Sequence, residues 1–172
     1  AKGIKNVLNS DFNYDKIEVR IDQSFFTKNF GTTKYRLEAG VIDNPLPYGL
    51  LFTGEGSYEK KYPYMIPNYF QTMRPYEFLS DQYAHLFLSH DFGGLLFKTG
   101  KFQPGLTLHN NFGWGTLSNK NKASNSLITY QTKEKVFMET GLQVDNVLKM
   151  NYMNIGYLGL GVGAYYRYGA YE

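Results

Sequence analysis

The chain has 172 residues, enough for one domain with a sizeable core, and its formal net charge of +3 is too weak and too scattered to predict nucleic-acid binding. The sequence contains no cysteine, which excludes a disulfide framework and a thiolate metal site. No apolar run reaches the roughly 18 residues of a membrane-spanning helix, whereas spanning β-strands need no such run.

The first part of the chain predicts a β-hairpin. Residues 1–14 are polar, and we expect a loop or the end of an earlier strand there. Alternating side chains then predict strands over 16–26 and 33–42, joined by a turn around Gly31. Both strands carry apolar side chains on one face and charges of both signs on the other. Cross-strand pairs between these charges would each contribute roughly 0.2–1 kcal/mol.

Residues 43–81 are less regular. A tight turn is expected over 43–48, followed by a strand over 49–57 that directs Glu55 to the polar face. The stretch 58–81 contains three prolines, which cannot donate to a strand ladder. We therefore expect a long loop there, with one short strand near Tyr69.

Regular alternation returns in the second half of the chain. It predicts strands over 82–92, 105–117 and 136–144 and a long final strand over 149–169, which follows a turn at Asp145 and Asn146. The polar stretch 118–126 is expected to be an exposed loop. In LGLGVGAYYRY (158–168), leucine, valine, alanine and tyrosine share one face, whereas glycines and an arginine lie on the other.

These elements amount to seven or eight strands joined as consecutive hairpins, with no helix. The predicted strands exceed the usual globular length of about 5–6 residues and reach the roughly 9–11 that cross a bilayer. The sequence therefore predicts an all-β antiparallel meander of about eight strands that forms a transmembrane outer-membrane β-barrel. Lipid would contact the apolar face, and polar side chains and glycines would face the interior.

Three blocks of sequence carry a family resemblance: YEFLSDQYAHLFLSHDFGGLLF (76–97), FMETGLQVDNV (137–147) and GLGVGAYYRYGAYE (159–172). Together they resemble the C-terminal barrel region of the DUF5686 group of Bacteroidota, whose members join a carboxypeptidase-regulatory-like domain to an outer-membrane barrel. The resemblance implies location in the bacterial outer membrane, outer-membrane lipid as a partner and such a domain upstream. It also implies that residues 1–172 are a barrel segment from the C-terminal part of a longer chain, with the final strand missing.

The same region is more distantly similar to barrels of the Omp85 and surface-antigen superfamily. Those barrels tuck an arginine-containing loop into the lumen, and Met73-Arg74-Pro75-Tyr76 occupies a comparable place. The resemblance implies that Arg74 is a loop latch, paired with an acid such as Glu139 or Asp91. The superfamily motif has glycine where this chain has Pro75, and a solvated Arg74 is the alternative.

The polar face supplies the candidates for a functional lining of the barrel interior. Its mixed charges predict a self-neutralising network more than an ion-selective ring. The candidates are Glu18, Arg20, Asp22, Lys34, Arg36, Glu38, Glu55, His85, Asp91, Glu139, Gln143 and Arg167.

Ser89, His90 and Asp91 are adjacent and raise the possibility of a hydrolase. In a strand, however, His90 points away from both neighbours, so no local nucleophile–base pair forms. His85, His109 and Asp91 have ligand-type side chains without a recognisable metal-site spacing. We therefore expect no catalytic residue, metal or cofactor.

The sequence as a whole predicts a non-enzymatic outer-membrane barrel with a role in transport or envelope biogenesis. It names no substrate and no protein partner. One alternative is an outer-membrane hydrolase that uses His85, Ser89 or His109. The other is a soluble β-barrel that binds a hydrophobic ligand, in which the apolar face would line the cavity and the polar face would meet water.

Overall fold

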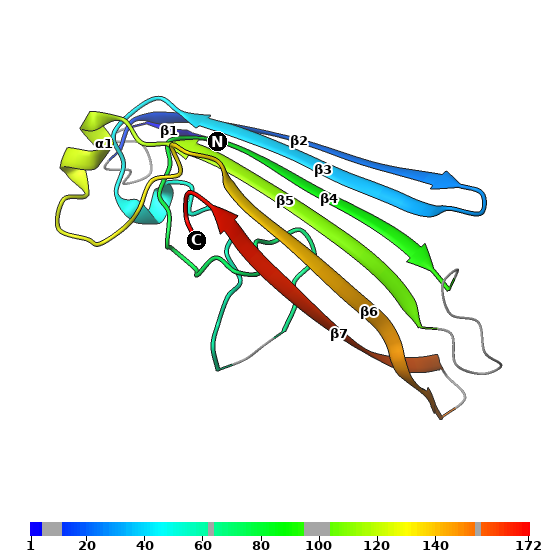
Figure 1. The fold of residues 1–172 in the computed structure, drawn as a ribbon. Coiled ribbons are helices and arrows are strands. Elements are labelled where there is room, and N and C mark those ends of the chain that lie inside the picture. Colours follow the sequence, from blue (N-terminus) through cyan, green and yellow to red (C-terminus); the bar gives the residue numbers. More distant parts are fainter. Residues whose placement is uncertain (5–11, 62–63, 95–103, 154–155) are drawn as a thin grey trace.

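The computed structural model describes residues 1–4, 12–61, 64–94, 104–153 and 156–172, which form one open antiparallel sheet in the order β1-β2-β3-β4-β5-β6-β7 (Figure 1). The predicted all-β meander is confirmed, but the sheet is not closed, and its strands number seven in the described residues rather than about eight. The strands are β1 (Lys2–Gly3), β2 (Tyr14–Thr27), β3 (Gly31–Ile42), β4 (Gln82–Gly93), β5 (Gly105–Thr116), β6 (Phe137–Tyr152) and β7 (Gly156–Gly169).

The first hairpin follows the prediction. Strands β2 and β3 cover the two expected strands, and β1 supplies the end of an earlier strand by pairing with Tyr14 and Asp15. Residues 5–11 of the expected N-terminal loop lie outside the described residues.

The strand predicted over 49–57 is wrong. A 3-10 turn, Tyr48–Leu50, begins this stretch, and only isolated bridges follow, from Phe52 to Ser80 and from Gly56 to Phe70. The backbone of Gly54 and Glu55 has positive φ, at 80° and 52°, which interrupts an extended strand. The short strand expected near Tyr69 is reduced to the bridge at Phe70.

The final strand is also divided differently. The chain does not turn at Asp145 and Asn146. Instead, β6 continues to Tyr152 through a register shift between Val144 and Leu148, with Asn146 at φ 55°. The stretch 149–169 therefore belongs to two strands. Because side chains alternate regularly on both sides of a bulge, a prediction from periodicity alone places a turn between two strands there.

The chain also contains a helix that was not predicted. Helix α1 (Asn119–Ser124) occupies most of the polar stretch 118–126, where the Ser118 side chain caps its N-terminus by accepting from the Asn121 backbone N–H. Asn121 and Asn125 are buried rather than exposed. A single short turn of helix leaves no periodic signal in the sequence. None of the helices in the described ranges has the length and apolar character that crossing a membrane would require.

The strand registers divide the sheet into two faces. Side chains directly opposite each other lie on the same face, and one such row runs from Arg20 through Glu38, His85, Gly113 and Phe137. We call the face that carries this row the inner face and the opposite one the outer face. The connection between β3 and β4, residues 43–81, is called the inner segment; it gathers at one end of the sheet with α1 and both termini (Figure 1).

The outer face is apolar and exposed. Its side chains alternate with the inner-face residues along the same strands, and those of Ile17 and Val162 are 61% and 62% exposed. Other exposed members are Val19, Ile21, Phe25, Leu37, Val41, Trp114, Leu142, Leu158, Leu160 and Tyr166. The predicted assignment of side chains to two opposite faces therefore holds across the sheet, with the apolar face uncovered.

The inner segment packs its aromatic side chains against the inner face. Phe70, Met73 and Phe78 are fully buried with Phe87 of β4 and Phe137 of β6. A Cβ on Gly113 would lie only 2.7 Å from Phe70 Cζ, so the missing side chain on β5 makes room for the ring. The core thus lies between the inner segment and the glycine-containing polar face.

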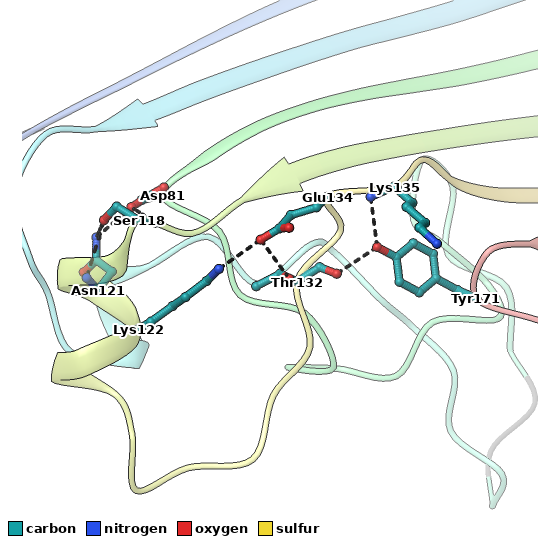
Figure 2. Close-up of polar contacts among 8 residues, drawn as sticks. All are labelled: Asp81, Ser118, Asn121, Lys122, Thr132, Glu134, Lys135 and Tyr171. Atoms are coloured by element: carbon teal, nitrogen blue, oxygen red, sulfur yellow. Dashed lines mark hydrogen bonds and ion pairs between the residues drawn. The ribbon is translucent and has the colours of Figure 1, made fainter.

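The loop after β5 is tied to the same end of the sheet (Figure 2). Asp81 Oδ2 accepts from the Ser118 backbone N–H at 2.8 Å and from Asn121 Nδ2 at 2.9 Å. The Tyr171 hydroxyl donates to the Thr132 carbonyl at 2.8 Å. These bonds position the stretch that leads into β6, including Lys133.

We expect Phe70→Ala to lower the free energy of unfolding by about 3–5 kcal/mol, because it leaves a ring-sized cavity between the inner segment and the sheet. Protease digestion within 43–81 should become faster. Phe25→Ala on the outer face is the matched control and should change neither measurement to that extent. Equal losses in both variants would contradict the assignment of Phe70 to the core.

Candidate functional site

Charged residues on β2 and β3 pair across the hairpin. Arg20 Nε lies 2.8 Å from Glu38 Oε1, and Arg36 Nε donates to Asp22 Oδ1 at 2.6 Å. Both pairs are register partners, so the predicted cross-strand charge pairing is confirmed. Arg20 remains largely exposed, whereas Glu38 is 2% exposed. A buried carboxylate is therefore joined to a solvated guanidinium.

Two further side chains meet Glu38 on the inner face. His85 is its register partner on β4, and Glu55 approaches from the inner segment, although not from the strand predicted for it. One ligand-type atom from each of the three residues lies within 4.8 Å of the other two. Burial of the Glu55 carboxyl, together with neighbouring Glu38, raises the pKa of Glu55 to about 7. We call Glu38, Glu55 and His85 the carboxylate–histidine cluster.

Lys133 closes the cluster from the loop before β6. Its Nζ lies 2.9 Å from His85 Nε2, and the side chain is fully buried. Burial lowers the pKa of Lys133 to about 7, because a desolvated ammonium is disfavoured. The sequence gives no indication of this residue, which lies in the polar stretch QTKEK without periodicity.

Glu139 on β6 holds the inner segment by a separate set of bonds. Its carboxylate accepts from the Gln71 and Thr72 backbone N–H groups at 2.9 Å each and from the Thr72 hydroxyl at 2.7 Å. Asn111 of β5 donates a fourth bond at 2.7 Å. The fully buried carboxylate is thereby saturated with donors, most of them from the inner segment.

An arginine–acid pair does join the inner segment to the sheet, but the arginine is Arg167 on β7 and the acid is Glu77 in the segment, whereas the resemblance implies Arg74 in the segment and an acid on the sheet. Arg167 Nη1 on β7 donates to Glu77 Oε1 at 2.9 Å, and both side chains are mostly buried. Arg74 is exposed, and its backbone N–H donates to Glu77 Oε2. The two acids suggested as partners of Arg74 are engaged elsewhere: Glu139 as described, and Asp91 with the Gly93 N–H.

A hollow of about 340 Å³ lies beside the inner segment on the inner face. Its lining comes from strands β3 to β7 and from residues 65–69 and 71 of the inner segment. The polar side chains of the lining include Lys34, Asp91, His109, Gln143 and Asp145. This mixture of acids, bases and amides suits water or a small polar solute better than an apolar ligand.

Of the residues considered for hydrolysis, His85, Ser89 and His109 lie on the inner face, but their side chains do not form a catalytic group. Ser89 and His109 are register partners on β4 and β5 and both line the hollow, whereas Phe87 separates Ser89 from His85 along β4. Within the described ranges no hydrogen bond connects Ser89 to either histidine. His90 faces away and contacts Thr33 and Phe30.

The predicted lining residues thus fall into three groups. Glu38, Glu55 and His85 come together, with Arg20 and Arg36 beside Glu38. Glu139 and Arg167 bind the inner segment. The third group lies near the hairpin ends or the edge of the sheet and consists of Glu18, Asp22, Lys34, Asp91 and Gln143.

Comparison with known proteins gives one match. Residues 1–126 match the model of the DUF5686 C-terminal domain, which is described as a family of unknown function. No curated protein and no solved structure matches the chain.

We expect Glu139→Gln to lower the free energy of unfolding by about 2–5 kcal/mol, because an amide cannot accept all four bonds and would direct its own donors at backbone N–H groups. Hydrogen exchange at the Gln71 and Thr72 amides should accelerate. The control is Glu18→Gln, an exposed carboxyl on the same face. Unchanged exchange at both amides in Glu139→Gln would show that the carboxylate does not hold the segment.

Proposed function

The chain belongs to the DUF5686 family, and we propose that it forms part of an integral outer-membrane β-barrel whose interior is occupied by the inner segment. The proposed role is transport or envelope biogenesis, without enzymatic activity. The observation that carries the proposal is an apolar sheet face that is exposed, while the polar face is buried where the inner segment covers it, as at Glu38, His85 and Glu139.

An apolar surface of this extent needs a partner other than water. The exposed leucines, isoleucines and valines of the outer face occur on β2, β3, β6 and β7. Half-exposed Leu86 and Leu88 of β4 and exposed Trp114 of β5 lie between them, so the apolar surface continues across the sheet. Soluble monomers rarely expose contiguous apolar patches beyond a few hundred Å². Acyl chains would cover this surface without leaving a polar group unsatisfied, because the backbone of each inner strand is paired on both sides.

Strand length and aromatic placement support the same proposal. The long strands have 12–16 residues, which exceeds the roughly 9–11 needed to cross a bilayer. Exposed Phe25 lies near the hairpin end of β2, whereas Trp114 and Tyr166 lie toward the opposite ends of β5 and β7. Aromatic side chains at two levels are typical of the girdles at membrane interfaces.

Closure of the barrel requires more strands than the sheet contains. Along the outer edge of β2 only Tyr14 and Asp15 are paired, and β7 has β6 as its neighbour within the described residues. Long unpaired edges are a liability in any solvent and are not tolerated in lipid. We propose that further strands join these two edges and complete the barrel.

The inner segment would act as a plug in such a barrel. Glu139 and Arg167 attach it to β6 and β7, and its aromatic residues fill the space over β4 and β5. A solute would therefore pass only if the segment moved or if the adjoining hollow widened. This arrangement favours a gated passage over an open pore.

The two alternative functions receive less support. A soluble barrel with a hydrophobic ligand needs the apolar face inside, and the inner segment covers the opposite face. A hydrolase needs a nucleophile bonded to its base, and Ser89 is not bonded to a histidine in the described structure.

Spin labels on neighbouring residues of β2 test the membrane assignment. We expect a nitroxide at Val19→Cys to collide preferentially with oxygen dissolved in lipid, and one at Glu18→Cys to collide with an aqueous nickel chelate. The two side chains lie on opposite faces of the same strand, so each labelled protein is the control for the other. Electron paramagnetic resonance of the protein in vesicles gives both collision rates.

A label at Val19 that favours the nickel chelate as strongly as the label at Glu18 would contradict the proposal. Labels at Ile21 and Asp22 repeat the comparison at the next pair of outer and inner positions along the strand, so a local distortion at one position would be recognised.

A further inference from the structure

The carboxylate–histidine cluster contains buried polar atoms that the described residues leave without a partner. Glu38 and His85 are both 2% exposed, and in the described part of the chain Glu38 Oε2 and His85 Nδ1 have no hydrogen-bond partner. An unsatisfied buried polar atom destabilises the folded protein, and more so when it is charged. Two such atoms lie in one cluster, and a ligand bound between them would satisfy both.

The orientation of the imidazole identifies the open atom. Lys133 Nζ occupies Nε2 at 2.9 Å, and the Cδ2 edge of the ring faces Gly113 on β5, at 3.4 Å from where a Cβ would lie. Nδ1 is on the opposite edge of the ring from Cδ2 and therefore faces β3, where Glu38 is the register partner of His85. The free nitrogen thus points toward the two carboxyl groups.

The dimensions of the cluster suit a single metal ion. Ligand atoms bound at about 2.0–2.2 Å lie no more than roughly 4.4 Å apart, and the three atoms here lie within 4.8 Å of one another. Arg20 contacts Oε1 of Glu38 and so leaves Oε2 available. A small contraction of flexible side chains would complete the geometry.

We propose that Glu38, Glu55 and His85 bind one divalent first-row transition-metal cation, of which Zn²⁺ is the probe. An imidazole with two carboxylates suits such an ion better than Mg²⁺ or Ca²⁺, which prefer oxygen ligands alone. Lys133 contacts the other ring nitrogen, Nε2. With a metal on Nδ1, the imidazole proton lies on Nε2 and is donated to the uncharged amine of Lys133.

A bound ion would join the plug to the barrel wall. Glu38 and His85 belong to β3 and β4, whereas Glu55 belongs to the inner segment. The ion would therefore stabilise the seated position of the segment, independently of the bonds made by Glu139. The site also does not depend on whether lipid or another partner covers the outer face.

Zinc titration of the full-length protein tests the proposal, after treatment with a chelator and removal of that chelator. Isothermal titration calorimetry should give one equivalent of bound Zn²⁺ and little heat with Mg²⁺. Glu55→Gln should weaken Zn²⁺ binding by at least about tenfold, because the amide is a poor ligand. The variant keeps the size of the side chain and removes a buried acid, so we expect it to fold.

Histidine variants separate this site from adventitious binding. The chain has three histidines, so His85→Gln should lose Zn²⁺ binding as Glu55→Gln does, while His109→Gln and His90→Gln retain it. Circular dichroism of each variant checks that the sheet is intact. The proposal is overturned if the protein binds no Zn²⁺, or if Glu55→Gln binds it as tightly as the unaltered protein.

Discussion

Successive side chains of a strand point to opposite faces of the sheet, so one alternating sequence determines both the apolar outer face and the polar inner face. Along β2, for example, the apolar side chains of Ile17, Val19 and Ile21 on the outer face are each followed by a charged side chain on the inner face. Acids and bases on the inner face cannot be buried without partners, because desolvation of an unpaired charge costs several kcal/mol. The structure therefore depends on a segment that brings those partners, and residues 43–81 are that segment.

The inner segment meets this requirement with two kinds of contact. Backbone N–H groups of Gln71 and Thr72 reach the Glu139 carboxylate, and Glu77 receives the guanidinium of Arg167. Aromatic rings fill the spaces above glycines, as Phe70 does at Gly113. Polar contacts fix the position of the segment and apolar contacts supply the burial, so the irregular backbone is held without joining the sheet. In the carboxylate–histidine cluster, Glu38 Oε2 and His85 Nδ1 remain without a hydrogen-bond partner among the described residues.

The sequence predicts the parts of this arrangement that repeat. Alternation is enough to assign Glu38, His85 and Glu139 to one face and Val19 and Leu160 to the other. The charge signs predict pairing between the first two long strands without naming the pairs, and Arg20 with Glu38 is one of them. It could not predict that Phe70 and Lys133 would be buried, since their contacts join residues far apart in sequence and follow no period. The bulge after Val144 and the short helix α1 were missed because each involves only a few residues.

The central claim is that the outer face of the sheet contacts acyl chains. Trp114 is the only tryptophan in these 172 residues and lies on the outer face of β5. The most direct measurement is the quenching of its fluorescence, taken as the difference between the protein and its Trp114→Phe variant, in vesicles of lipids brominated on the acyl chains. The account predicts strong quenching by the brominated lipid and weak quenching by aqueous acrylamide. Strong quenching by acrylamide with none by the brominated lipid would contradict it.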